Sequence, residues 1–375
     1  MKRILITLAI VLTAVNSLFA ALPCDSVLRR QAARMLMVGF KGDKVDENSD
    51  AARYIRDLKV GAIILFDVDL TGSGKIGSRN ITGSEQLKTL TTNLHRWADY
   101  PLIVTADQEG GLVARLKTQY GFQPTVTSLY LGQCNNEDTT RYYARRIAAE
   151  LANHGINLNL APVVDIHNPD CPPLGKYDRC YSDNPGSIVR HASWFIDESR
   201  KSGVGCTLKH FPGHGSAIND SHWGLVDVSS TWSPRELEPF KKLIKKGKAQ
   251  FIMTAHIFNN NLDADYPATL SRKTITGVLR EQLHYDGVVI TDDMFMQGII
   301  DHYSIEQAIV LAINAGADML CVGNNINTGF EPDRPFRLVD IIVKAVKEGR
   351  IPYGRIQEAN RRIERASATL GKFPQ

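Results

Sequence analysis

An excess of charge of one sign is missing from this 375-residue sequence. It has 44 basic and 40 acidic side chains, which leaves a formal net charge of +4. So small an excess creates no field that would attract a polyanion, because nucleic-acid binding depends on dense positive charge. We therefore expect no nucleic acid among the partners of this protein.

Long hydrophobic runs are also missing after the first twenty residues. Lys2 and Arg3 precede an apolar run over residues 4–15, and small residues suited to cleavage follow around Ala20. This pattern is typical of a secretory signal peptide. The run is short for about 30 Å of hydrocarbon, and no later segment approaches about 18 apolar residues. We expect residues 1–20 to be a signal peptide and the mature protein, residues 21–375, to be exported to periplasm or medium without a membrane anchor.

None of the six cysteines belongs to a CxxC pair, so the usual spacing of zinc and redox sites is missing. Disulfides persist in exported proteins, and six cysteines allow about 15 pairings. Cys171 and Cys180 flank a proline-rich loop, which makes them the most plausible local pair, although the pairing stays open. Cys206 and Cys321 lie in apolar runs, where a free thiol packs as a small hydrophobic group.

Two further features are missing: a GxGxxG turn after the first strand, and a Ser/Pro-rich linker. Instead, eight short apolar runs alternate with amphipathic segments. The expected strands are residues 35–40, 61–66, 102–106, 157–164, 205–210, 251–256, 287–291 and 317–322, and the expected helices are residues 85–97, 139–153, 185–202, 234–246, 272–283, 305–315 and 336–348. We expect Ser84 to cap the first of these helices and residues 71–78 to form an inserted surface loop.

Strand and helix alternation with nearly continuous apolar strands indicates a parallel sheet covered on both faces. Eight such units predict an α/β fold, a (β/α)8 TIM-type barrel in a single domain. An open doubly wound sheet is the alternative. The missing GxGxxG turn removes the main reason to prefer it.

Ionisable residues follow five consecutive predicted strands, at the barrel end where reactive groups gather. They are Asp107 and Glu109, Asp165 and His167, Lys209, His210 and His214, His256, and Asp292 and Asp293. A carboxylate held at this position can attack an electrophilic carbon, whereas an aspartate after a strand can also simply cap the next helix. We expect Asp292 to face the barrel mouth and Asp293 to cap, since only one of two neighbours points inward.

A metal site is the other interpretation of the histidines His210, His214 and His222. Metal-dependent barrel hydrolases would be expected to carry an HxH pair at an early strand end, and the sequence has none. We therefore expect neither a metal nor a cofactor. Asp220-Ser221-His222 instead allows the aspartate to orient the imidazole.

These residues together resemble a known family. KHFPGHG at residues 209–215, Asp220-Ser221-His222, DQEGG at residues 107–111 and Thr291-Asp292-Asp293 are similar to glycoside hydrolase family 3, and more narrowly to its single-domain bacterial β-N-acetylglucosaminidases. The resemblance runs from about residue 30 to residue 371. It identifies residues 21–375 as a catalytic barrel domain of that family.

The resemblance implies a role for each matched position. Asp292 would be the nucleophile, His222 the general acid/base and Asp220 its orienting partner. The implied sugar-binding residues are Asp107, Arg115, Arg179, Lys209 and His210. An imidazole with a pKa near 6.5 can replace the second carboxylate of most retaining glycosidases, because it can give and take a proton near neutral pH.

Three places depart from the family pattern. Leu112 stands where the family usually has arginine, Cys180-Tyr181 replaces Ser-Phe, and an insertion precedes Arg79-Asn80. The nucleophile and the acid/base pair are intact.

The expected function is retaining exo-hydrolysis of terminal β-linked N-acetylglucosamine from muropeptides or chitin-type oligosaccharides, by a monomer. The alternatives are another family 3 β-glycosidase, a phosphorylase that passes the sugar to phosphate, a sugar-binding barrel without turnover, and a metal-dependent hydrolase.

Overall fold

The computed structural model describes residues 22–72, 74–75, 77–219, 224–326 and 329–373. Within them, eight strands close into a barrel in the order β1-β12-β11-β9-β7-β6-β3-β2. The strands are β1 (Leu36–Gly39), β2 (Ala62–Ile64), β3 (Ile103–Ala106), β6 (Leu158–Asn159), β7 (Gly205–Phe211), β9 (Phe251–Thr254), β11 (Val288–Asp293) and β12 (Met319–Val322). All neighbouring pairs are parallel. The predicted barrel is confirmed, and the open sheet is wrong.

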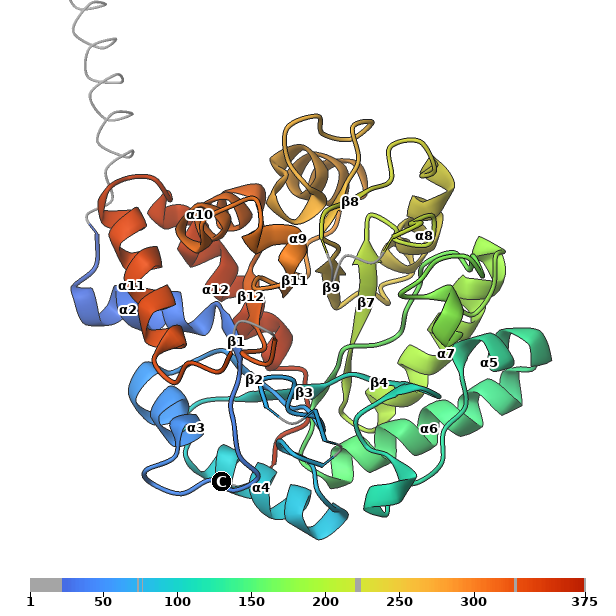
Figure 1. The fold of residues 1–375 in the computed structure, drawn as a ribbon, viewed down its shortest axis with the longest axis horizontal. Coiled ribbons are helices and arrows are strands. Elements are labelled where there is room, and N and C mark those ends of the chain that lie inside the picture. Colours follow the sequence, from blue (N-terminus) through green and yellow to red (C-terminus); the bar gives the residue numbers. More distant parts are fainter. Residues whose placement is uncertain (1–21, 73, 76, 220–223, 327–328, 374–375) are drawn as a thin grey trace, which may run out of the picture.

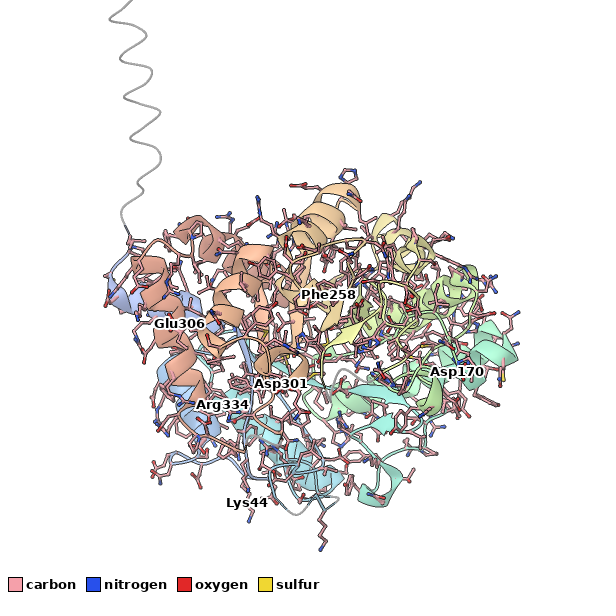
Figure 2. All side chains as sticks on the ribbon, turned by 45° about the horizontal axis from the view of Figure 1, so that its top comes forward. Lys44, Asp170, Phe258, Asp301, Glu306 and Arg334 are labelled. Carbon is pink, nitrogen blue, oxygen red and sulfur yellow. The ribbon has the colours of Figure 1, made fainter. Side chains whose placement is uncertain are left out.

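Helices form a ring around the barrel (Figure 1). They are α2 (Asp25–Arg34), α3 (Asp50–Arg53), η1 (Tyr54–Leu58), α4 (Ser84–Arg96), α5 (Ser128–Cys134), α6 (Glu137–Asn153), α7 (Pro185–Lys201), α8 (Glu238–Lys245), η7 (Lys273–Gln282), α9 (Gln297–Ile300), α10 (Ile305–Ala315), α11 (Arg334–Lys347) and α12 (Tyr353–Ser367). Because the helices cover the sheet from outside, most strands are buried along their whole length, which explains their continuous apolar sequences. The labelled Lys44, for example, lies at the lower edge of the molecule (Figure 2).

One strand is much shorter than its apolar sequence predicts. Of residues 157–164, only Leu158–Asn159 form strand β6, and an isolated bridge from Val163 to Lys209 follows. Pro162 lies between the two parts and has no N–H group for the sheet. The chain therefore leaves the barrel early at this point and reaches Asp165 as a loop.

Two local predictions are wrong. Ser84 does not cap α4, because the cap position is Gly83 and the Ser84 hydroxyl lies 2.8 Å from His154 Nε2. Cys171 and Cys180 are both buried free thiols, and Cys171 Sγ is directed at the carbonyl oxygen of His214, 3.5 Å away. In both cases a partner far away in the sequence contacts the side chain in place of the local contact that was predicted.

The predicted signal peptide lies outside the described residues. Among the residues that the structure describes, no helix combines the length and the apolar character needed to cross a membrane. The predicted insertion is described except for residues 73 and 76. It is anchored by Arg79, whose Nη1 lies 2.9 Å from Asp69 Oδ1.

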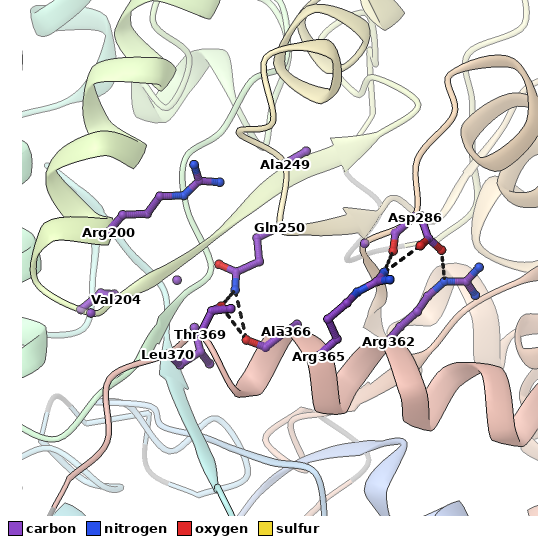
Figure 3. A pocket seen from close by; sticks show the side chains of 13 residues that line it. Arg200, Val204, Ala249, Gln250, Asp286, Arg362, Arg365, Ala366, Thr369 and Leu370 are labelled. Atoms are coloured by element: carbon purple, nitrogen blue, oxygen red, sulfur yellow. Dashed lines mark hydrogen bonds and ion pairs between the residues drawn. The ribbon is translucent and has the colours of Figure 1, made fainter.

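The foot of the barrel, opposite the predicted site, contains a cavity of about 550 Å³ lined by the residues before β7, β9 and β11 and by the end of α12. Arg362 and Arg365 both point to Asp286 there (Figure 3). Next to this exposed cluster, Asp318 is fully buried and accepts hydrogen bonds from Val289 N at 2.9 Å and from Arg280 Nη2 at 2.6 Å. A network of ion pairs thus stabilises the foot of the barrel.

We expect Asp318→Ala to lower the free energy of unfolding by about 3–5 kcal/mol, because it leaves the largely buried guanidinium of Arg280 without a carboxylate partner. Asp286→Ala, which removes an exposed carboxylate of the same network, should cost less than about 1 kcal/mol. Urea unfolding of both variants measures the difference. Equal small losses would show that Asp318 does not hold the foot together.

Candidate active site

The antiparallel hairpin β4 (Gln108–Gly110) and β5 (Val113–Ala114) begins directly after Asp107 at the carboxyl end of β3. The side-chain oxygen of Gln108 accepts the backbone N–H of Arg115 at 2.8 Å and that of Leu116 at 2.9 Å. These two hydrogen bonds close the hairpin and bring Arg115 back beside the start of β4. Arg115 Nη2 consequently lies 3.0 Å from Asp107 Oδ2.

A buried lysine lies between two carboxylates at the centre of the candidate site. Lys209, near the end of β7, places Nζ 2.8 Å from Asp107 Oδ1 and 2.7 Å from Glu109 Oε1. The side chains of Lys209 and Glu109 are each only 2% exposed. Residues two apart on an extended chain face the same side, so Asp107 and Glu109 both reach the ammonium group.

The opposite charges of this cluster keep each buried group in its ionised form. Burial alone would raise the pKa of Asp107, but Lys209 and Arg115 outweigh it and hold that pKa well below its usual range. Burial would likewise lower the pKa of Lys209, and the two carboxylates raise it instead. All the groups are therefore ionised at neutral pH, and the ammonium keeps one donor direction for a ligand.

Glu109, which the sequence places at the end of the third strand without a role, is also part of the site. It accepts a two-pronged contact from Arg179, with Nε 2.8 Å from Oε2 and Nη2 2.7 Å from Oε1. Arg179 is held further by the carbonyl oxygen of Pro173 at 2.8 Å. The fixed guanidinium has little rotational freedom left. The two-residue spacing from Asp107 is the signal that could have identified Glu109.

His210 is oriented by Asp165, which follows the short β6. Its Nδ1 lies 2.7 Å from Asp165 Oδ2, and its backbone N–H donates to the same carboxylate. A ring nitrogen facing a carboxylate carries the proton, so Nε2 is the acceptor atom of the neutral ring. That nitrogen lies 3.5 Å from Arg179 Nη2. The predicted residues Lys209, His210 and Arg179 thus converge on one place.

The two aspartates that end β11 have different surroundings. Asp293 accepts the backbone N–H groups of Phe295, in the turn before α9, and of Gly323 after β12, each at 3.0 Å. The prediction that it caps the next helix is wrong, because the cap position of α9 is Met296 and no side chain of the described residues caps that helix. Burial raises its pKa to about 6. Asp292 is half-buried, and its charge acts on the buried His214 and Cys321.

Asp292 lies at the same end of the barrel as the lysine cluster. Asp292 lies at the carboxyl end of β11, and Lys209 lies near the carboxyl end of β7; both strands pair in parallel with β9 between them. Asp220 and His222, the predicted acid/base pair, lie outside the described residues. The five predicted sugar-binding positions and Asp292 are therefore brought to one end of the barrel.

The loop directly after β2, before the insertion, adds a residue that the sequence analysis missed. Asp67 is buried, its Oδ2 lies 2.5 Å from Lys117 Nζ, and its Oδ1 lies 3.8 Å from Arg115 Nη1. Arg115 thus bridges Asp107 and Asp67. Leu112, where the family pattern has arginine, is 67% exposed at the tip of the hairpin.

Glu109→Gln should reduce the extent to which the free energy of unfolding falls at acid pH. Burial would raise the pKa of Glu109, but Arg179 and Lys209 lower it, so its ionised form stabilises the fold. Because the folded pKa is depressed, that contribution is present above the unfolded pKa of about 4.3 and is lost as the pH falls below it.

Urea unfolding between neutral pH and pH 2 measures this, with Glu137→Gln as control, since Glu137 pairs with Arg141 on the outer surface of α6. The wild type and the control should lose stability more steeply than Glu109→Gln below about pH 4.3. Identical slopes in all three proteins would contradict the charge assignment.

Comparisons with known proteins agree with this geometry. The family model "Glycosyl hydrolase family 3 N terminal domain" matches residues 27–366. A beta-hexosaminidase from Tolumonas auensis is 33% identical over 293 residues, 77% of this chain and 83% of that protein, and one from Idiomarina loihiensis is 36% identical over 297 residues, 77% and 84%.

Among solved structures, a glycoside hydrolase family 3 beta-N-acetylglucosaminidase from Paenibacillus sp. matches with a TM-score of 0.81 and 32% identity, over 95% of this chain and 65% of that one. A beta-N-acetylhexosaminidase from Beutenbergia cavernae matches with a TM-score of 0.80 and 28% identity, over 93% and 99%. The chain belongs to glycoside hydrolase family 3.

Proposed function

We propose that the protein is a retaining exo-β-N-acetylglucosaminidase. The observation that carries this proposal is the position of Asp292 at the barrel end that also holds the Asp107, Lys209 and Arg179 network. The relatives named above, which are beta-hexosaminidases and a beta-N-acetylglucosaminidase, support the N-acetylated sugar. The substrate is a terminal β-linked N-acetylglucosamine of a peptidoglycan fragment or chitin-type oligosaccharide.

The first half of the reaction forms a covalent intermediate. A carboxylate oxygen of Asp292 attacks the anomeric carbon while the bond from that carbon to the glycosidic oxygen breaks. The electron pair of the broken bond stays on the leaving oxygen, which takes a proton from the imidazolium of His222. Asp220 stabilises the charged imidazole before the proton is transferred.

The second half reverses these roles. Neutral His222 takes a proton from water, whose oxygen attacks the anomeric carbon and releases the Asp292 carboxylate. Two inversions give net retention. The sugar is held meanwhile by Asp107, Arg115, Arg179, Lys209 and His210. Their hydrogen-bonding groups are fixed by ion pairs and, for His210, by the hydrogen bond to Asp165.

The surroundings of the two aspartates favour Asp292 over Asp293 as the nucleophile. Asp293 uses both carboxylate oxygens for backbone N–H groups, which hold it in place and draw on its charge, so it is the poorer nucleophile. We also propose that the enzyme is exported and acts as a monomer. The signal-peptide pattern at residues 1–20 supports export.

Asp292→Asn should lower kcat for an aryl N-acetyl-β-glucosaminide by on the order of 10³-fold or more, because only binding and proton transfer remain. The thermal melting point should stay close to that of the wild type, and Asp286→Asn at the foot should keep full activity. Release of the chromophore measures turnover. Wild-type activity in Asp292→Asn would refute the proposed nucleophile.

The first product should be the β-anomer of free N-acetylglucosamine. Retention follows from two successive inversions, and water is the acceptor in the proposed reaction. Proton NMR of the early reaction in phosphate buffer distinguishes the anomers and detects a sugar 1-phosphate. Formation of the α-anomer would exclude the covalent route. Formation of a sugar 1-phosphate would show that phosphate, and not water, is the acceptor.

A further inference from the structure

The carboxyl end of β11 is the place where the barrel sheet becomes irregular. The register of β11 with β9 runs only to Ile290, which lies opposite Met253. On the other side, the register between β11 and β12 shifts between Ile290 and Asp293. An irregular strand end leaves buried backbone groups that need other partners. Asp292 and Asp293 lie at this end, so their conformation depends on contacts beyond the regular sheet.

His256, one of the ionisable residues predicted to follow the strands, supplies such a contact. It comes shortly after β9 and is fully buried. Its Nε2 lies 2.9 Å from the carbonyl oxygen of Asp293. Because a carbonyl oxygen can only accept a hydrogen bond, Nε2 carries the proton of this contact. The imidazole thus continues the link between β9 and β11 beyond the last paired residues.

The other ring nitrogen of His256 is held by a threonine. Nδ1 lies 2.9 Å from Thr269 Oγ1, which belongs to the short 3₁₀ helix Ala268–Leu270. Thr269 Oγ1 in turn lies 2.8 Å from Thr254 Oγ1 at the end of β9. All three side chains are fully buried. Any rotation of the imidazole would break buried hydrogen bonds, so the direction of its Nε2–H group is fixed.

The backbone of Asp293 connects His256 with the proposed nucleophile. Its carbonyl oxygen accepts from His256, and its N–H donates to Asp292 Oδ1 at 2.8 Å. Its carboxylate accepts the backbone N–H groups of Phe295 and Gly323. Because Asp293 is held at both its carbonyl group and its carboxylate, its N–H has a fixed direction. One oxygen of the Asp292 carboxylate consequently has a fixed place.

We propose that His256 is a positioning residue for the nucleophile. Its hydrogen bond to the Asp293 carbonyl oxygen holds the backbone whose N–H binds the Asp292 carboxylate. The inference rests on the proposed function, in which Asp292 attacks the anomeric carbon. His256 acts through the backbone of Asp293 and exchanges no proton with the substrate.

Asparagine and glutamine at position 256 separate the two contacts of the ring. The amide nitrogen of glutamine lies about as far along the side chain as histidine Nε2, so it can still donate to the Asp293 carbonyl oxygen. The amide of asparagine ends near the place of Nδ1, where it can reach Thr269 but not Asp293. A merely structural role would change the amount of folded protein and leave the activity of each folded molecule unaltered.

The experiment compares His256→Asn, His256→Gln and the wild type on an aryl N-acetyl-β-glucosaminide with a strongly acidic phenol. Such a phenol leaves with little help from a proton, so kcat/KM reports the attack of the nucleophile. His256→Asn should lower kcat/KM per folded molecule on the order of 10²-fold, because a displaced nucleophile loses its attack geometry. His256→Gln should recover kcat/KM to within about tenfold of the wild type, because only the Thr269 contact is lost.

Binding of the sugar provides a second readout. The inhibition constant of free N-acetylglucosamine should stay within about twofold of the wild-type value in both variants, because the Lys209 network that holds the sugar is unchanged. A loss confined to the attack therefore appears in kcat/KM and not in the inhibition constant. The folded fraction of each protein is taken from its circular-dichroism melting curve.

His95→Asn is the matched control. His95 is also buried, and its Nε2 lies 2.9 Å from a backbone carbonyl oxygen, that of Gly155. It belongs to the outer helix α4, and Gly155 precedes β6 at the foot of the barrel. The variant should lower the melting point and keep the kcat/KM of the wild type. If His256→Asn does not fold, His256→Leu replaces it with the same expected result, since leucine fills the space without a donor.

The outcomes distinguish this inference from the proposed function. A lowered kcat/KM in His256→Asn with an unchanged inhibition constant, together with recovery in His256→Gln, supports the positioning role. A folded His256→Asn with the kcat/KM of the wild type overturns it. A His256→Gln variant as impaired as His256→Asn also overturns it, and so does an inhibition constant that rises in parallel with the loss. A wild-type protein that does not hydrolyse the aryl glycoside overturns the proposed function instead.

Discussion

The site depends on one buried contact, the ammonium group of Lys209 between the carboxylates of Asp107 and Glu109. A lone ammonium or carboxylate at this depth would change its protonation state to avoid the cost of desolvation. Together, the opposite charges keep each group ionised, as the depressed pKa of Asp107 and the raised pKa of Lys209 indicate. Arg115 and Arg179 extend the same pattern on either side. The result is a rigid set of donors and acceptors at the end of the barrel.

The barrel brings together site residues that lie far apart in the sequence. Asp107 and Lys209 are brought together by the adjacent positions of β3, β6 and β7 in the strand order, although they are far apart along the chain. Apolar runs specify the strands, so the fold and the end at which polar residues gather could be predicted from periodicity alone. The pairing of polar side chains across strands could not be predicted in this way, because it depends on strand register and loop conformation. Asp67 was missed for this reason, and Glu109 was found at the strand end but not its partners Lys209 and Arg179.

The wrong local predictions have the same physical origin. Ser84 has the sequence of a helix cap, yet its hydroxyl lies within hydrogen-bonding distance of His154 from another helix. Cys171 and Cys180 are close in sequence, but both are buried free thiols. Local chemistry predicts what a side chain can do, whereas tertiary neighbours decide what it does. Pro162 is the opposite case, since a local property cut short a strand that the hydrophobic pattern predicted.

The difference between Asp292 and Asp293 is central to the proposed chemistry. Two neighbouring carboxylates at one strand end cannot share one environment, and the backbone N–H groups of Phe295 and Gly323 are directed at Asp293. The most direct measurement uses the 5-fluoro derivative of N-acetylglucosaminyl fluoride, which slows breakdown of a covalent intermediate. Mass spectrometry of the digested protein should find the added sugar on the peptide that contains Asp292, and on its carboxylate. A label on Asp293 or on another residue would contradict the account.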